Sequence, residues 1–178
     1  MKRIFIIVIL IAFFPLKIFA NTNYKTLLNN DLNKYIKCFS IKDYRCMSSY
    51  ILPDIMDQMG GLEGFINLMN TLEETFKEQG LILRKEKFEN GLPSPIIKDE
   101  NIIVSIVPTL LPISLNGQEG VIKSSIIAIS YNDGQTWYYT EGTQEGQSFL
   151  NDISAEIFKM INFPKSSMIL NGETIEIN

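Results

Sequence analysis

The sequence predicts an α+β fold in which N-terminal helices pack on a strongly bent antiparallel sheet, with an additional helix near the C-terminus. Up to about residue 79, apolar residues recur three or four positions apart, which is the spacing of helices that bury one side. From about residue 81 to 140 the chain is rich in branched apolar residues and contains Asn-Gly and Asp-Gly pairs, which is typical of strands joined by tight turns. Helical spacing returns after residue 148.

The first twenty residues have the order of parts of a secretory signal peptide. The basic residues Lys2 and Arg3 precede an apolar run from Ile4 to Phe14, and the small residue Ala20 lies where a signal peptidase would cut. The alternative, an uncleaved membrane anchor, needs roughly 20 consecutive apolar residues. Because the run is shorter than that and is followed by Lys17, the sequence favours a cleaved signal.

The charge of the chain limits its partners. Removing residues 1–20 takes away three positive side chains and no acidic one, so the formal net charge falls from -4 to -7. Nucleic acid is therefore not expected as a partner, because its binding depends on Lys and Arg. We expect residues 21–178 to form one α+β domain, periplasmic or secreted, without a stable membrane anchor after signal cleavage. Its expected partner is an unknown small apolar ligand or a protein.

The residue types present also limit the chemistry. The chain contains no histidine, which removes Ser-His-Asp and Cys-His nucleophile systems and His-ligated metal sites. Cys38 and Cys46 make an even pair in a chain expected to be exported, and this favours a disulfide. Two buried thiols on adjoining helices are the alternative. No cofactor, metal site or catalytic residue is predicted.

Four helices are predicted before the sheet, over residues 23–39, 43–50, 54–59 and 62–79. Pro53 suits the first turn of the third helix, and Gly80 is placed to cap the fourth. The acidic residues of the fourth helix, Glu73, Glu74 and Glu78, are interpreted as part of its solvent face.

Strands are predicted over residues 81–88, 102–115, 121–131 and 136–140. Pro108 and Pro112 cannot donate hydrogen bonds, so the second strand must be bulged or lie partly on an edge. In the third strand, Ile127 and Ala128 point to opposite faces, which predicts that both faces of the sheet are covered. Tight turns are expected at Asn116-Gly117, Asn132-Asp133-Gly134 and Asn171-Gly172.

A helix is predicted after the sheet, over residues 148–161, where apolar residues again follow helical spacing. The tail after Pro164 could form a small hairpin or a frayed end.

Five residues before and within the last predicted strand of the sheet match much of the Asp-box pattern, Ser-x-Asp-x-Gly-x-Thr-Trp, which recurs in sialidase-like propellers. They are Ser130, Asn132, Gly134, Thr136 and Trp137. Asn132 replaces the aspartate of the pattern, and the sequence holds one copy where a propeller needs several blades. The motif is therefore interpreted as a hairpin device, a polar turn with the tryptophan packed behind it.

Three aromatic residues are candidates for lining a ligand pocket, namely Trp137, Tyr139 and Tyr131. A concave sheet lined by such rings would form a small-molecule site. Ordinary core packing is the alternative.

The order of elements over residues 23–140 resembles the cone-like fold of the nuclear-transport-factor-like and ketosteroid-isomerase-like superfamily. Two local segments add to the resemblance, residues 60–65 (Gly-Gly-Leu-Glu-Gly-Phe) and residues 130–137. Members of that superfamily include isomerases, dehydratases, ligand carriers and protein-interaction modules, so the fold does not select a function. The leading expectation is an exported, non-enzymatic binding or interaction module. The alternatives are a carboxylate-dependent isomerase or hydrolase of the cone fold, and a periplasmic immunity-type inhibitor.

Overall fold

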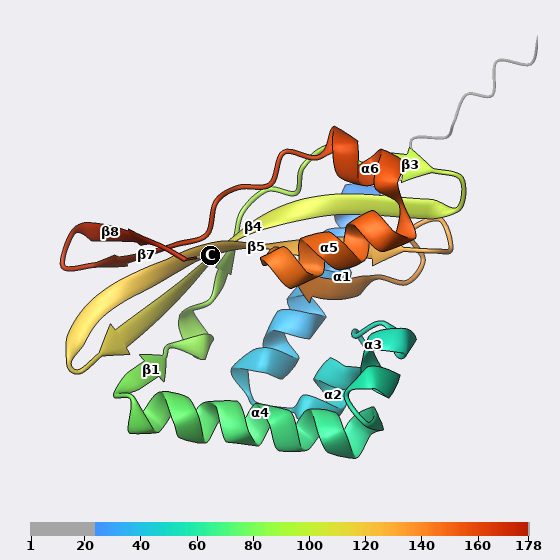
Figure 1. Cartoon of the computed structure of the whole chain (residues 1–178). Helices are drawn as coiled ribbons and strands as arrows, with labels where there is room; N and C mark the ends of the chain where they lie inside the picture. Colours follow the sequence, from blue (N-terminus) through green and yellow to red (C-terminus); the bar gives the residue numbers. More distant parts are fainter. Residues whose placement is uncertain (1–23, 178) are drawn as a thin grey trace, which may run out of the picture.

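A computed structural model describes residues 24–177 and shows an α+β fold (Figure 1). Helices come first along the chain, an eight-stranded antiparallel sheet that does not close follows, and C-terminal helices pack against it. The predicted fold class is confirmed. The predicted signal peptide, residues 1–20, lies outside the described residues.

The four N-terminal helices fall close to their predicted ranges. They are α1 (Tyr24–Ser40), α2 (Tyr44–Ser48), α3 (Pro53–Gln58) and α4 (Gly61–Glu78). The side chain of Asp43 caps α2 by accepting a hydrogen bond from the backbone N–H of Cys46 at 2.9 Å. Pro53 occupies the first turn of α3, as expected. The disulfide between Cys38 and Cys46 joins α1 to α2, which confirms the predicted pair.

Two long strands form the centre of the sheet, β4 (Ile102–Leu115) and β5 (Gln118–Ser130). They pair one to one from Ile103 opposite Ser130 to Leu115 opposite Gln118. Asn116 and Gly117 connect them with φ values of 50° and 84°, which is the left-handed backbone of a two-residue hairpin turn. The pairing of β4 with β5 continues up to this turn, so β5 begins at Gln118, whereas the sequence predicts its start at residue 121.

Short strands flank the central pair. The strands β1 (Leu81–Leu83), β2 (Glu89–Asn90) and β3 (Ile97–Asp99) lie along β4, β6 (Tyr138–Glu141) and β7 (Ser167–Leu170) lie along β5, and β8 (Glu173–Glu176) pairs with β7. The tail therefore forms a small hairpin. The single strand predicted over 81–88 is wrong, because a 3₁₀ turn, η1 (Lys85–Lys87), follows β1 and brings Lys85 into the interior.

The two prolines of β4 are accommodated without a bulge, since β4 pairs with β5 without interruption. The carbonyl of Pro108 accepts a hydrogen bond from Gly91 N–H, and that of Pro112 accepts one from Arg84 N–H, both at 2.8 Å. In an antiparallel strand the nitrogen of a residue faces the same neighbour as its carbonyl. Both proline nitrogens therefore face the side of β4 along which β1, β2 and β3 pair, and not β5. Because these three strands are short and interrupted, this side of β4 is a partial edge of the sheet.

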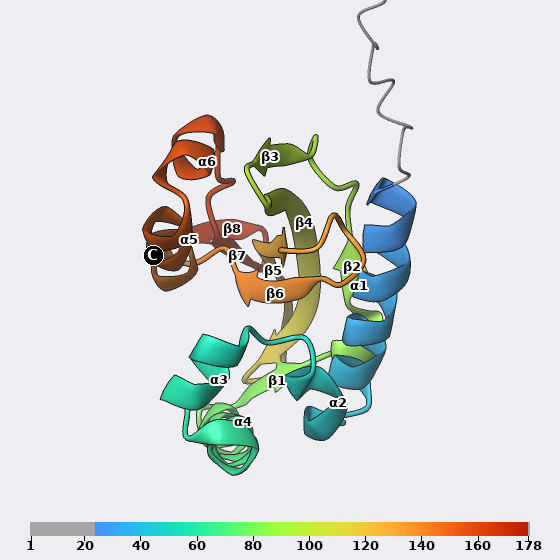
Figure 2. The same cartoon turned by 90° about the vertical axis from the view of Figure 1, so that its right-hand side faces the viewer.

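Helices cover both faces of the sheet, as predicted (Figure 2). On one face, Leu28 and Leu32 of α1 pack against Val107 and Ala128. On the other, Ile127 packs in a cluster with residues of α5 (Gln144–Ile153) and α6 (Ala155–Met160). A third apolar cluster joins α2 and α4.

The C-terminal helical segment is two helices and not the single helix predicted over 148–161. Ser154 separates them with an extended backbone, φ −158°. Its hydroxyl accepts a hydrogen bond from Ile157 N–H at 3.2 Å and donates one to Asp99 at 2.9 Å. Thr143 caps the first helix, which therefore starts at Gln144, before the predicted position.

Within residues 24–177 no helix combines the length and the apolar character that crossing a bilayer requires.

Candidate functional site

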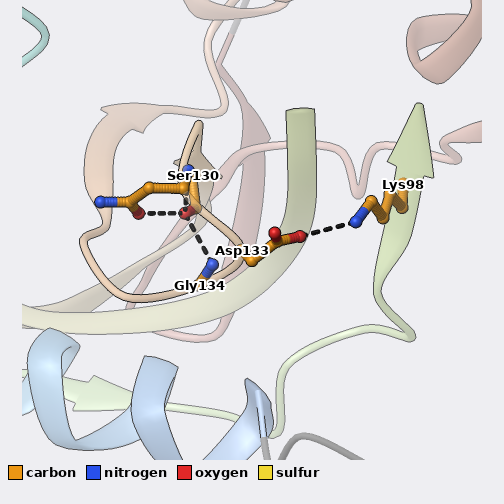
Figure 3. Close-up of polar contacts among 5 residues, drawn as sticks. Lys98, Ser130, Asp133 and Gly134 are labelled. Atoms are coloured by element: carbon orange, nitrogen blue, oxygen red, sulfur yellow. Dashed lines mark hydrogen bonds and ion pairs between the residues drawn. The ribbon is translucent and has the colours of Figure 1, made fainter. Parts of the chain in front are cut away.

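The turn that follows β5 is built by hydrogen bonds to its own side chains (Figure 3). The hydroxyl of Ser130 accepts a hydrogen bond from Gly134 N–H at 2.9 Å. Asp133 and Gly134 have φ values of 55° and 75°, so the Asp-Gly pair adopts the left-handed conformation expected from the sequence. Asp133 also forms an ion pair with Lys98 of β3 at 2.6 Å. These contacts fix the backbone on both sides of Tyr131 and Asn132.

Asn132 holds the turn where the Asp-box pattern has aspartate. Its Oδ1 accepts hydrogen bonds from Thr136 N–H at 2.9 Å and from the Ser130 hydroxyl at 3.1 Å, and its Nδ2 donates to Thr136 Oγ1 at 3.2 Å. Trp137 is 1% exposed and belongs to the core cluster on the α1 face. This geometry agrees with the interpretation of the motif as a hairpin device.

Beside this turn lies an open cleft of about 250 Å³, which we call the Tyr131 cleft. It is lined by Leu52, Pro53, Asp54, Tyr131, Asn132, Tyr138 and Phe149. The lining comes from the start of α3, from the turn between β5 and β6, from the first residue of β6, and from α5. Apolar and aromatic side chains dominate, with a few polar groups, which is the usual composition of a small-molecule site.

The rings of Tyr131 and Tyr138 form a pair, with centroids 6.4 Å apart and planes inclined by 56°. Tyr131 is 42% exposed, whereas Tyr138 and Phe149 are half-buried. Partial burial raises the pKa of the Tyr131 phenol, and the negative charge of Asp54 adds to that rise. The carboxylate of Asp54 is thus close enough to act on the phenol electrostatically.

Among the residues that the structure describes, Asp54 is the one charged side chain that lines this cleft. It is exposed, and within the part of the chain that the structure describes it makes no ion pair. The amide of Asn132 is already used within the turn. The cleft therefore presents one uncompensated negative charge beside aromatic rings.

The structure separates the three sequence-predicted pocket residues. Tyr131 lines the cleft, but Trp137 and Tyr139 are each 1% exposed and pack against α1 on the opposite face of the sheet. Tyr138 joins Tyr131 in their place, because successive side chains of a strand point to opposite faces. The succession of three aromatic residues at 137–139 predicts that at least one ring points away from the others, and in the structure that ring is Tyr138.

Other lining residues could not be found from the sequence by a local signal. Phe149 belongs to an apolar helical pattern, and Leu52 and Asp54 belong to the beginning of another helix. About eighty residues separate α3 from the turn after β5, and only the tertiary fold brings these segments together.

Asp31 and Tyr139 form a second polar pair, on the α1 face. The Tyr139 hydroxyl donates a hydrogen bond to Asp31 Oδ2 at 3.2 Å. Burial raises the pKa of Asp31, and the hydrogen bond from Tyr139 only partly offsets this. Tyr35 and Tyr50 pack around Tyr139, with ring centroids 5.0 and 5.9 Å from it. Asp31 lines neither the Tyr131 cleft nor the second cleft described next.

A second open cleft, of about 570 Å³, lies between the start of α5 and the C-terminal hairpin. Its lining is more polar and consists of Gly142, Thr143, Gln144, Gln147, Phe163, Pro164, Lys165, Ser166, Glu176 and Ile177. Lys165 and Glu176 neutralise each other in an ion pair at 3.0 Å. This cleft therefore offers neither an aromatic cluster nor a free charge.

The interpretation of Glu73 as a solvent-facing residue is wrong. Glu73 is half-buried and pairs with Lys42 at 2.7 Å and with Lys85 at 2.5 Å. Lys85 is buried and also lies over the ring of Phe39, 4.7 Å from its centroid. This cluster ties η1 to α4 and α1, and its charges are satisfied internally, which indicates a structural role.

Comparison with known proteins adds no relative: no protein-family model, curated protein or solved structure matches this chain. Among residues 24–177, no group of three or more Cys, Asp or Glu side chains is placed to hold a metal ion. Functional inference therefore depends on the geometry of the Tyr131 cleft.

Proposed function

We propose that this chain is an exported, non-enzymatic binding module that holds a small, partly apolar molecule in the Tyr131 cleft. One observation carries the proposal: three aromatic side chains and one unpaired carboxylate, from separate segments of the chain, converge on a cleft of about 250 Å³. Aromatic walls with a few polar groups are typical of small-molecule sites. The cleft volume of about 250 Å³ lies just below the usual range for ligand pockets, roughly 300 to 1,000 Å³, so it suits a ligand of few heavy atoms.

Among the described residues, burial raises the pKa of two carboxyl groups, those of Asp31 and Glu141, and neither residue lines a described cleft. This favours binding over acid-base catalysis as the proposed function. A carboxylate-dependent isomerase needs an acid beside the space that its substrate occupies. Asp31 has a raised pKa, but it is held by Tyr139 and lines neither described cleft. The acid that does line the Tyr131 cleft, Asp54, is exposed to solvent.

Export belongs to the same proposal. It is supported by the basic and then apolar composition of residues 1–20, and by the disulfide, since disulfides persist in oxidising compartments. A periplasmic or secreted location follows from these two features. Membership of the nuclear-transport-factor-like and ketosteroid-isomerase-like superfamily is also proposed, and its support is the order of α1 to α4 before an unclosed antiparallel sheet.

Native mass spectrometry tests the proposed function. The mature protein is purified from the cells that make it, and its native and denatured masses are compared for the wild type, Tyr131→Ala and Leu110→Ala. Leu110 is a matched control, because it is an exposed apolar residue of β4, 38% exposed against 42% for Tyr131, and does not line the cleft.

We expect extra mass that disappears on denaturation in the wild type and in Leu110→Ala, and that is reduced in Tyr131→Ala. The proposal fails if the wild type shows its bare mass, both as purified and after incubation with the small-molecule fraction of the same cells. It also fails if Tyr131→Ala retains as much bound mass as the control.

A further inference from the structure

We propose that the Tyr131 cleft takes a small organic cation with a methylated, quaternary ammonium headgroup. This inference rests on the proposed function and narrows its ligand to one chemical class. Three properties of the lining support it: its aromatic rings, the sign of its charge and its supply of hydrogen-bond acceptors.

The aromatic rings provide the first argument. Tyr131, Tyr138 and Phe149 line one small cleft. The faces of aromatic rings carry negative electrostatic potential and attract cations that approach within about 6 Å of the ring centroid. The planes of Tyr131 and Tyr138 are inclined by 56°, so the two rings do not stack face to face and do not cover one another.

The charge of the lining provides the second argument. Among the described residues that line the cleft, Asp54 is the one acidic side chain, and none is Lys or Arg. An anion placed there would meet an uncompensated carboxylate, whereas a cation would neutralise it. Asp54 also lies close enough to Tyr131 for its charge to affect the phenol, so a ligand that contacts the Tyr131 ring lies within the field of the carboxylate.

Hydrogen-bond acceptors decide between classes of cation. A primary ammonium brings three N–H donors and a guanidinium brings five, and each donor taken out of water needs an acceptor. The Oδ1 of Asn132 already accepts two hydrogen bonds within the turn, which leaves the Asp54 carboxylate and the tyrosine hydroxyls as side-chain acceptors. A quaternary ammonium has no donor to satisfy, and its methyl groups can contact Leu52 and Phe149.

A titration with choline chloride tests the inference. Chemical shifts of the tyrosine rings are followed by NMR in the purified mature protein, with sodium chloride at the same ionic strength as a control for salt. We expect saturable shifts of Tyr131 and Tyr138 with a Kd of about 1 mM, a reasonable affinity for a ligand of few heavy atoms. The neutral analogue 3,3-dimethylbutan-1-ol, which has carbon in place of nitrogen, should bind at least about fivefold more weakly.

Paired variants separate the charge from the shape of the cleft. Asp54→Asn should raise the Kd for choline about fivefold. This factor corresponds to the largest contribution that an exposed ion pair usually makes to binding. Asp57→Asn should leave it unchanged, because Asp57 is an exposed acid on the same helix that does not line the cleft. Both positions are exposed, so both variants should fold, and circular dichroism verifies this.

The outcomes separate this inference from the proposed function. Equal binding of choline and its neutral analogue, or equal effects of Asp54→Asn and Asp57→Asn, overturns the cation but leaves a small-molecule cleft. If choline causes no saturable shift while native mass spectrometry shows bound mass that depends on Tyr131, the cation is likewise overturned and the proposed function stands. If choline causes no saturable shift and native mass spectrometry shows no bound mass, the quaternary-ammonium inference and the proposed binding function both fail.

Discussion

Replacing Glu73 by Gln removes the negative partner of a buried lysine while keeping the shape of the side chain. Glu73 is 25% exposed at its side chain, and it accepts hydrogen bonds from Lys42 and from Lys85, whose own side chain is 7% exposed. The variant therefore leaves Lys85 enclosed beside the ring of Phe39 without a carboxylate. Losing one partner of a buried ion pair is destabilising, because the other charge stays out of water.

The pKa of Glu73 sets the size and the pH dependence of the effect. Burial alone would raise this pKa, but hydrogen bonds from Lys42 and Lys85, together with the positive charge of Lys85, outweigh burial and lower it from 4.5 to about 2. Because the folded state favours the charged form, the stabilisation is fully present above pH 4.5 and is lost as pH falls through about 2. The shift corresponds to about 3 kcal/mol at pH 7, and solvent screening of the partly exposed carboxylate reduces this to about 2 kcal/mol.

Urea unfolding measures this difference, with the fluorescence of the single, buried Trp137 as the signal. We expect Glu73→Gln to lower the free energy of unfolding by about 2 kcal/mol at pH 7 and by less than half of that at pH 3. Glu74→Gln, an exposed neighbour without a described ion pair, is the control and should cost less than about 0.5 kcal/mol at either pH. An equal loss at both pH values, or no loss at pH 7, would refute the assigned role of the Glu73 charge.

Two further substitutions test the turn and the disulfide. Gly134→Ala should lower the free energy of unfolding by about 2 to 3 kcal/mol, because a Cβ there would lie 2.6 Å from the Tyr24 ring and the residue has φ 75°. Gly117→Ala meets no atom within 4 Å at a similar φ of 84°, so urea unfolding should show about 1 kcal/mol for it, and equal losses would contradict the steric explanation. Replacing both Cys38 and Cys46 by Ser should cost about 2 to 3 kcal/mol from the entropy of the short closed loop, and wild type measured with and without reductant should show the same difference. A variant as stable as the wild type would mean that the bond contributes nothing to the unfolding equilibrium.

The elements that were predicted correctly depend on local chemistry. The apolar spacing of α1 and α4 and the Asn116-Gly117 turn each express a preference of a few neighbouring residues. The bounds of β4 were predicted as observed, although it contains two prolines, because its branched apolar residues suit a strand buried on both faces. The proline nitrogens could be placed only once the short strands beside β4 were known.

The elements that were missed depend on partners distant in the sequence. In the sequence, Lys85 falls within a segment predicted to be a strand. In the structure its side chain points into the interior, where it contacts Glu73 and Phe39 of other helices. Serine has only a moderate preference for the interior of a helix, but this does not mark Ser154 as the end of α5 and the N-cap of α6. That role depends on the hydrogen bond from its hydroxyl to Asp99 of β3. These are tertiary contacts, which periodicity does not report.

The candidate site was predicted in part. Of the three aromatic residues named as pocket candidates, Tyr131 lines the cleft, while Trp137 and Tyr139 fill the core. Strand alternation separates Tyr138 from Trp137 and Tyr139, but only the register of β5 with β6, in which Ile129 lies opposite Tyr138, puts Tyr138 on the same face as Tyr131. Asp54 and Phe149 lie on two different helices and both line the cleft, and nothing in the sequence around either residue indicates that they share a site.

The long ladder between β4 and β5 has a consequence for the order in which the chain can fold. Its thirteen residue pairs can form one after another, starting beside the two-residue turn at Asn116-Gly117. Each new pair then closes only a short loop. In contrast, α1 reaches its partner strands only after closing a loop of about eighty residues, which costs more entropy before any contact is gained. We expect the central hairpin to form early and the helices on its two faces to dock afterwards, α1 last.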